Sequence, residues 1–268
     1  MRRVRCAAAA LASALLLTGC AQSVDPIERL GKKAAEGVRP HAVPDRSYRH
    51  WGLPRPLART PLHPARRLTR QPGAHPPPVV DRVPTPDRVV FLTYDDGAEQ
   101  DPRFVAMVRE LRLPVSVFLT DSVAGPGYGH FARLRALGAG IGNHTVDHRA
   151  PAGLPYAGQR AEICGQQDRL HARLGVRPRL FRPPYGSYDA TTLRAAADCG
   201  ISAVVLWRAA LTPAGLAYTH GPRRLRPGDI VLVGPDESAG PSLWKRTARV
   251  LRRVQEQGLT VGRLEDYL

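Results

Sequence analysis

Short apolar runs that alternate with helical patterns recur through residues 88–268 of this 268-residue chain. The runs are rich in strand-forming residues, and strands that alternate with helices favour a parallel sheet, because parallel strands need long crossover connections. The pattern predicts an α/β fold, either a parallel sheet or a barrel, with enough length for one substantial core. The expected strands are Val89–Leu92, Val115–Leu119, Gly138–Gly142, Leu180–Phe181, Ile201–Trp207, Ile230–Val233 and Leu259–Val261.

Helical patterns fill several of the gaps between these runs. Asp101 followed by Pro102 is typical of a helix start, and this helix is expected to continue to Leu111. Further helices are expected at Phe131–Leu137, Gly158–Leu174, Asp189–Cys199 and from Ser242, as the cap, to Gln257.

Two adjacent carboxylates, Asp95 and Asp96, close the first expected strand in the sequence T-Y-D-D-G. The C-terminal ends of strands are where parallel α/β folds usually build their chemistry. Neighbouring side chains diverge at such a turn, so one carboxylate can bind a metal while the other handles a proton. A solvated turn is the simpler interpretation of a D-D-G sequence taken alone.

Two histidines, His144 and His148, follow the small-residue run Gly138–Gly142. From a helical turn or a tight loop, both imidazoles can reach one divalent ion. Together with Asp96 they would form a set of two imidazoles and one carboxylate, which leaves positions open for water and substrate, as hydrolysis at a metal requires. Surface histidine pairs at this spacing are also common, so the pattern needs further support.

Arg182 stands at the end of another expected strand, in the sequence F-R-P-P-Y-G. Its forked donors can hold a carboxylate in one orientation, and the two prolines stiffen the chain around it. The alternative is a surface arginine in a proline-rich turn.

The sequences T-Y-D-D-G, H-T-V-D-H and R-P-P-Y-G resemble, in this order and spacing, the first three motifs of the polysaccharide deacetylase family. These are the NodB-homology enzymes of carbohydrate esterase family 4. The resemblance covers residues 88–268 and implies an irregular (β/α) barrel of about seven strands, the number of apolar runs counted above. It also implies metal-dependent removal of acetyl groups from N-acetylated sugars.

The same resemblance assigns roles to individual residues. The ligands of a divalent metal, zinc in the first place with cobalt, nickel or manganese as alternatives, would be Asp96, His144 and His148. Asp95 would be the general base, oriented by Arg182. The backbone N–H of Tyr185 would help to hold the tetrahedral oxyanion.

Two further motifs of the family are incomplete in this sequence. The fifth motif ends a strand with L-x-H, whose histidine is the general acid, but here Gly234 occupies that position. The fourth motif supplies an aspartate and a tryptophan, but here Trp207 leads into residues 208–213, which hold no carboxylate. The metal and base half of the site is therefore expected to be present and the acid half to be missing.

The missing acid bears on the choice of substrate. A positioned proton donor is worth roughly 10²–10⁴ in rate, and an amide needs its departing nitrogen protonated. An ester with a good leaving group needs less help, so we expect weak N-deacetylation and relatively better hydrolysis of activated acetyl esters. His220 can be considered as a substitute donor, although a solvated loop histidine is the simpler interpretation.

Two classes of function fit these features. One is a metal-dependent hydrolase that removes acetyl groups from N- or O-acetylated cell-wall or extracellular polysaccharide. The other is an inactive relative that binds glycan or metal, and hydrolysis of peptide-like amides is a third possibility. Asp95 and Arg182 favour the enzyme, because a binding protein has no evident use for a base and the residue that orients it.

The beginning of the chain predicts export. Arg2, Arg3 and Arg5 precede the apolar run Ala7–Leu17, which is short for a membrane span. The sequence L-T-G-C that ends at Cys20 resembles a bacterial lipoprotein signal of the actinobacterial type. By this resemblance, residues 1–19 are removed and lipid on Cys20 anchors the protein outside the cytoplasm, at the cell membrane. An ordinary secretory signal is the alternative.

Residues 20–87 are expected to form a disordered, basic linker. Residues 23–87 hold 13 of the 26 prolines and 12 basic against 6 acidic residues. Such a composition buries too little apolar surface to fold, and predicts a semi-extended tether. Its charge favours anionic lipids or wall phosphates as partners, whereas export and the lack of a basic and aromatic array argue against nucleic acid.

Cys164 and Cys199 remain once the cysteines of the signal and the anchor are set aside. In an oxidising compartment, an even remainder suggests one disulfide between the two helices that carry them. Two unpaired buried thiols are the alternative.

Overall fold

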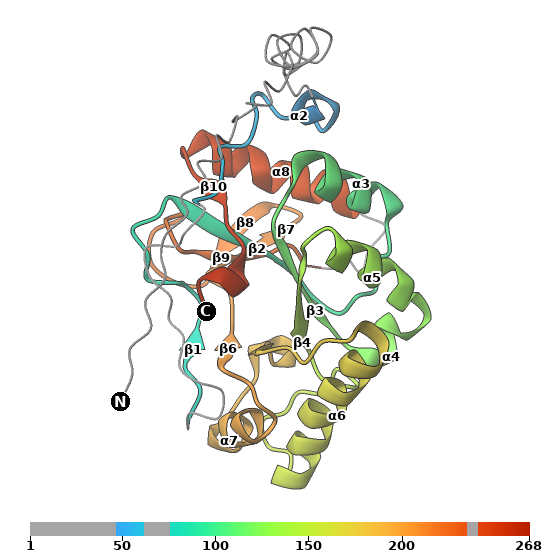
Figure 1. Ribbon diagram of the computed structural model, residues 1–268. Coiled ribbons are helices and arrows are strands. Elements are labelled where there is room, and N and C mark those ends of the chain that lie inside the picture. Colours follow the sequence, from blue (N-terminus) through green and yellow to red (C-terminus); the bar gives the residue numbers. More distant parts are fainter. Residues whose placement is uncertain (1–46, 62–75, 235–240) are drawn as a thin grey trace, which may run out of the picture. The chain divides into compact units, whose positions relative to one another are not determined.

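The computed structural model describes residues 47–61, 76–234 and 241–268, all of which belong to one unit, Asp45–Leu268 (Figure 1). The unit is built on a curled, mainly parallel sheet with the strand order β1-β6-β5-β4-β3-β2-β9-β7-β8. A further strand, β10, pairs with β2 outside this path. The predicted α/β class and the barrel-like sheet are thereby confirmed.

All seven expected strands form, and their mutual pairings are parallel. Their bounds are β2 (Val89–Tyr94), β3 (Val115–Leu119), β4 (Gly140–Asn143), β5 (Leu180–Phe181), β6 (Ala203–Val205), β9 (Ile230–Leu232) and β10 (Thr260–Val261).

Three strands were not expected. β1 (Val79–Val80) pairs parallel to β6, and β7 (Ala209–Thr212) forms an antiparallel hairpin with β8 (Gly215–Tyr218). Pairing with neighbours makes strands of these segments, since β1 has only two residues and β7 begins with two alanines, which are poor strand formers.

The predicted helices are confirmed, with shifts of a few residues at their ends. Asp101 caps α3 through its side chain, which accepts a hydrogen bond from the backbone of Arg103. Ser242 precedes α8 as expected, although its hydroxyl makes no capping bond. None of the helices described has the length and apolar character needed to cross a membrane. The longer helices are α3 (Pro102–Leu111), α5 (Tyr128–Ala136), α6 (Tyr156–Leu174), α7 (Ala190–Asp198) and α8 (Leu243–Glu256).

Both faces of β2 are buried, which explains its uninterrupted apolar sequence. Val90 and Leu92 pack in the larger cluster, whose other members include residues of α3, α5 and α8. Val89 and Phe91, on the opposite face, pack in a separate cluster inside the curl of the sheet. The helices follow one another around the outside of the curl, from α8 through α3, α5 and α6 to α7 (Figure 1). Successive side chains of a strand point to opposite faces, so position along β2 decides which face a residue meets.

Two stretches of the predicted linker are packed parts of the fold, so the linker prediction is wrong there. After α2 (Ser47–His50), Trp51 is 2% exposed, packs with Met107 and Ala248, and donates its indole N–H to Glu110 at 2.9 Å. β1 and the fully buried Val83 are the second stretch. The composition of residues 23–87 as a whole does not reveal single apolar residues that pack against the rest of the fold. Residues 20–46 and 62–75 of the predicted linker, and the predicted signal, lie outside the described residues, so the prediction for Cys20 does too.

The expected disulfide is present between Cys164 on α6 and Cys199, which follows α7. The two Cα atoms are 5.0 Å apart. Gln167 on α6 also donates to the backbone oxygens of Cys199 and Pro178, so covalent and hydrogen bonds together hold α6 and α7 side by side.

Candidate metal centre

The predicted site residues follow parallel strands of one sheet. Asp95 and Asp96 follow β2, His144 follows β4, and Arg182 follows β5. Because parallel strands end at the same edge of a sheet, these side chains, far apart in the sequence, can meet there. The structure brings them together.

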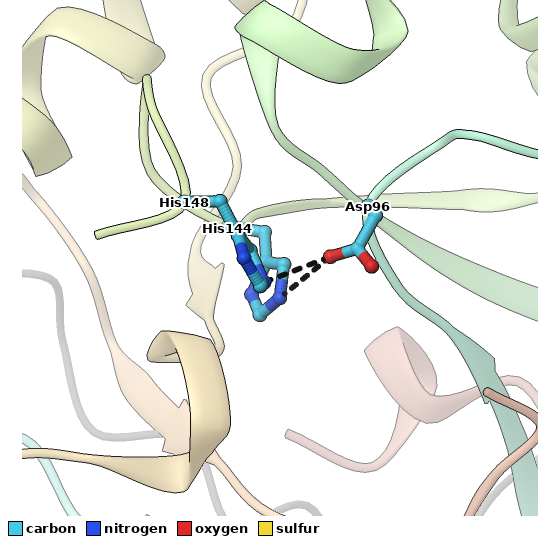
Figure 2. A group of neighbouring side chains, drawn as sticks. All are labelled: Asp96, His144 and His148. Atoms are coloured by element: carbon cyan, nitrogen blue, oxygen red, sulfur yellow. Dashed lines mark ion pairs between the residues drawn. The ribbon is translucent and has the colours of Figure 1, made fainter. Parts of the chain in front are cut away.

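Asp96, His144 and His148 form one compact cluster (Figure 2). The Asp96 Oδ1 atom lies 3.2 Å from Nε2 of His144 and 3.0 Å from Nε2 of His148. The three potential ligand atoms all lie within 4.8 Å of one another. His144 is only 2% exposed, whereas Asp96 and His148 are partly exposed, so the cluster is open towards solvent on one side.

The tautomer of His144 follows from its hydrogen bond. Its Nδ1 lies 2.6 Å from the backbone oxygen of Arg182, and because a carbonyl can only accept, Nδ1 carries the proton. In the neutral ring, Nε2 then presents a lone pair towards Asp96 Oδ1, which is buried and accepts no hydrogen bond of good geometry from any residue described. Two acceptors this close are stable only with a cation or a proton between them.

This arrangement fits a divalent cation. Two imidazole nitrogens and one carboxylate oxygen are a ligand set used for zinc and similar metals, and three protein ligands leave further positions open. Burial by itself raises the pKa of Asp96, but the close approach of the His144 and His148 imidazoles outweighs it and lowers that pKa below its ordinary value. Asp96 is therefore a carboxylate at neutral pH, the form that binds a metal.

The loop that carries the two histidines has an unusual backbone. Thr145 and His148 have φ angles of 71° and 57°, and elsewhere in the site Asp96 has 68° and Tyr185 60°. In the described part of the chain the only other non-glycine residue with positive φ is Arg112, a helix cap. Left-handed backbone is unfavourable for such residues and tends to occur at functional sites, where surrounding contacts hold it in place.

Two polar residues hold this loop, and the sequence did not single them out. Asn143 accepts a hydrogen bond from the backbone of Thr145 at 3.0 Å. One oxygen of Glu162, on α6, accepts from the backbone N–H groups of both Val146 and Asp147, at 3.1 and 3.0 Å. The only available signal was the polar character of these residues, Asn143 at the end of a strand and Glu162 on a helix.

Asp95 is bound by Arg182, the most deeply buried charge of the site. Arg182 is 0% exposed, and its Nη1 donates to Asp95 Oδ1 at 2.7 Å and to the Thr93 hydroxyl at 2.9 Å. Burial lowers the pKa of Arg182, while the neighbouring Asp95 opposes that shift. The second oxygen of Asp95 lies 4.0 Å from Nε2 of His144, so the carboxylate stands at the margin of the metal cluster.

Tyr185 lies at the rim of the cluster. Its side chain is 71% exposed, and its ring centroid is 4.8 Å from that of His148. It belongs to the short helix η2 (Pro184–Gly186), which follows Arg182 directly. The motif R-P-P-Y-G therefore delivers two residues to the site.

The acid half of the expected site is different. Gly234 follows β9 without a side chain, and Arg208, after Trp207, is buried and donates to the backbone oxygen of Pro222. The side chain of His220 is 63% exposed, and its Nε2 lies 2.5 Å from Oδ2 of Asp81, so its contact is with a surface carboxylate. Among the residues described, those that follow β6 and β9 thus bring no acidic side chain or imidazole to the site.

Comparison with known proteins agrees with this geometry. Residues 82–204 match the sequence model of the polysaccharide deacetylase family. An uncharacterized protein of Streptomyces coelicolor is 64% identical over 197 residues, which are 73% of this chain and 79% of that protein. The peptidoglycan-N-acetylglucosamine deacetylase of Bacillus cereus is 29% identical over 99 residues, 36% of each chain.

Solved structures share the fold. A family 4 carbohydrate esterase from Bacillus anthracis has a TM-score of 0.60 at 21% identity, covering 70% of this chain and 86% of that one. A family 4 pseudoenzyme from the same species has a TM-score of 0.61 at 20% identity, covering 71% and 69%. The family match and these neighbours support placing this chain among the polysaccharide deacetylases of carbohydrate esterase family 4.

Removal of a ligand tests the cluster. Changes to residues that only support metal ligands typically lower metal affinity by about 10–100-fold. His144→Ala deletes a direct ligand and is expected to lower zinc affinity by more than this. His220→Ala, a surface histidine, serves as the matched control. Zinc titration by calorimetry measures both, and an unchanged affinity of His144→Ala would place the metal elsewhere.

Proposed function

We propose that this protein is a metal-dependent hydrolase that removes acetyl groups from N- or O-acetylated polysaccharide of the cell wall or the extracellular space. The observation that carries the proposal is that a set of metal ligands and a second, separately bound carboxylate lie together at the C-terminal ends of the strands. Asp96, His144 and His148 converge as metal ligands, and a fully buried Arg182 holds the second carboxylate, Asp95, beside them. Metal binding alone requires only the ligand set, not the second carboxylate.

The chain's own residues supply most steps of such a reaction. Asp96, His144 and His148 would hold the cation, zinc or else cobalt, nickel or manganese, which when bound supplies a Lewis acid that polarises the acetyl carbonyl. Arg182 binds Oδ1 of Asp95, and Oδ2 is the oxygen nearer His144. In the proposal, this oxygen takes the proton of the attacking water as general base.

Fewer residues are available for the later steps, which are stabilisation of the oxyanion and protonation of the leaving group. The backbone N–H of Tyr185 would donate to the oxyanion as the carbonyl carbon becomes tetrahedral. The departing group then needs a proton, and Gly234 offers none at the position where the family has its general acid. The loss of this donor slows amide cleavage more than cleavage of an ester with a good leaving group.

Export of the protein is part of the proposal. We infer that residues 1–19 act as a signal and that lipid on Cys20 anchors the protein to the outer face of the cell membrane. The Cys164–Cys199 disulfide supports a non-cytoplasmic location, because structural disulfides persist mainly in oxidising compartments. Anionic polymers of the cell surface are proposed partners of the basic N-terminal segment.

The base can be tested on an activated acetyl ester. Asp95→Asn in the zinc-loaded protein is expected to lower turnover of p-nitrophenyl acetate by about 10²–10⁴, the usual contribution of a general base. His220→Ala should leave turnover unchanged. Equal rates in Asp95→Asn and the unaltered protein would remove Asp95 from the mechanism.

The missing acid can be tested by restoring it. A Cβ added at position 234 is tolerated, because among the described residues it meets only the Leu232 side chain, at 3.9 Å, which is an ordinary van der Waals contact. Gly234→His is expected to raise release of acetate from chitooligosaccharide by up to about 10²–10⁴, with a much smaller gain on p-nitrophenyl acetate. Gly234→Ala is the control. Equal gains on both substrates would argue against a missing acid.

The second candidate function is an inactive relative that binds glycan or metal, and Gly234 is the observation that favours it. One equivalent of zinc bound without turnover of ester or amide, before and after Gly234→His, would establish that function.

The anchor has its own test. Cys20→Ala is expected to move the protein from the membrane fraction to the soluble extracytoplasmic fraction, because it removes the site of lipid attachment. Cys6→Ala, within the expected signal, should leave the distribution unchanged. Fractionation followed by immunoblotting measures both, and a Cys20→Ala protein that stays with membranes would contradict lipidation.

A further inference from the structure

A second cavity, of about 650 Å³, lies away from the metal ligands. It is formed by residues of α2 and the turn after it, by the end of β7, by Gly234, and by one face of α8. We refer to it as the basic cleft, and it is lined by Arg49, His50, Trp51, Gly52, Leu211, Thr212, Pro213, Gly234, Pro241, Trp244, Lys245, Arg246, Ala248, Arg249 and Arg252.

We propose that the basic cleft binds the anionic groups, carboxylates or phosphates, of an acidic polysaccharide whose acetyl groups are removed at the metal centre. The polysaccharide part of this inference rests on the proposed function. The anion binding itself rests on the cleft alone.

The first observation is charge. Lys245, Arg249 and Arg252 are exposed and share one side of α8, since residues three and four apart on a helix are neighbours. Arg49 of α2 is exposed on the same cleft. Among the described residues that line the cleft there is no aspartate or glutamate, so these cations give the described lining a positive potential.

The second observation concerns the partners of these cations. Among the residues described, none of the four forms an ion pair with a carboxylate. Arg249 donates to the backbone oxygen of Pro213 at 3.1 Å and Arg252 to that of Gly52 at 3.4 Å, while Lys245 lies over the ring of Trp244. Each neutral partner leaves the positive charge uncompensated, and each guanidinium has five N–H donors, so capacity for an anion remains.

Arg246 provides the contrast. It also lines the cleft, but it is buried and pairs with Glu99 and with the backbone oxygen of Pro241. This pair lies inside the wall of the cleft and neutralises the buried charge of Arg246. The exposed cations of the same helix have no such carboxylate partner among the residues described.

The third observation is the apolar floor. Trp244, Leu211 and Pro213 are at least partly exposed in the lining, and Trp244 is backed by the buried Trp51, which it meets edge to face with ring centroids 5.6 Å apart. A site for inorganic phosphate alone would need only cations. Sugar rings present apolar faces as well as polar edges, so an apolar floor beneath a cationic rim fits charged sugars.

The fourth observation is position. Gly234 lines the basic cleft, and the preceding residue, Val233, donates its backbone N–H to Thr93, two residues before Asp95. One end of the cleft therefore adjoins the strand that carries the base. A polysaccharide with an acetyl group at the metal centre can extend past Gly234 into the cleft.

The test is a binding measurement with three probes on the full chain. These are oligogalacturonate, which carries carboxylates, poly(glycerol phosphate), which carries phosphates, and the neutral chitohexaose. We expect at least one acidic probe to bind more tightly than the neutral one by calorimetry. Its affinity should fall as salt is raised, because exposed charges are screened.

Paired variants locate the binding. Arg249→Gln with Arg252→Gln should weaken binding of the acidic probe by about tenfold or more, the loss expected for charge-assisted hydrogen bonds. Arg160→Gln with Arg173→Gln removes the same charge from two exposed positions of α6 and should leave the affinity unchanged. Zinc stoichiometry reports that each variant is folded, and Arg249→Lys with Arg252→Lys should restore part of the affinity.

Each outcome bears on the proposal. Equal losses in the two glutamine pairs, or no preference for either acidic probe, would overturn it, because binding would then reflect net charge or sugar alone. A loss confined to the cleft pair supports it, and the tighter probe identifies carboxylate or phosphate. His144→Ala should bind the acidic probe normally. If cleft-dependent binding occurs without any turnover in the unaltered protein, the proposed function fails while the cleft stands.

Discussion

The buried guanidinium of Arg182 is the constraint on which the site depends. A full charge without exposure to water is costly unless it is paired and hydrogen-bonded, and here each guanidinium nitrogen has a partner among Asp95, the Thr93 hydroxyl and the backbone oxygens of Val205 and Leu206. These partners belong to or directly follow β2 and β6, so the guanidinium connects three strands. The backbone oxygen of the same residue fixes the tautomer of His144. One residue thus orients the carboxylate and a metal ligand together.

The surrounding fold serves this arrangement from both sides. Inside the curl, Phe118 packs against the guanidinium, with 4.4 Å from its ring centroid to the guanidinium carbon. Outside, α6 contributes Glu162, which binds the backbone of the histidine loop, and Cys164 two residues later binds α7 covalently. The left-handed residues of the loop are therefore held by a helix that is itself fixed at a second point. Pre-organisation of this kind keeps metal ligands in place before metal arrives.

Many of the strands and site residues were predictable because they depend on local sequence. Continuous apolar runs mark strands buried on both faces, and short motifs at their ends name the cluster of Asp96, His144 and His148. The parts that escaped prediction depend on tertiary contact. The strand character of β7 comes from pairing with β9 and β8, Trp51 is ordered by a pocket between α3 and α8, and Asn143 acts through a loop conformation that composition does not encode. The basic cleft likewise unites α2 and α8, which are distant in sequence.

The two buried faces of β2 have a consequence for how such a protein can change over time. Odd-numbered residues from Val89 through Thr93 face the inside of the curl, and the same phase brings Asp95 to Arg182. One inserted or deleted residue within the strand would invert this phase, exchange the two apolar faces, and present the wrong carboxylate to the guanidinium. Substitutions can therefore accumulate in this strand, whereas changes of its length cannot.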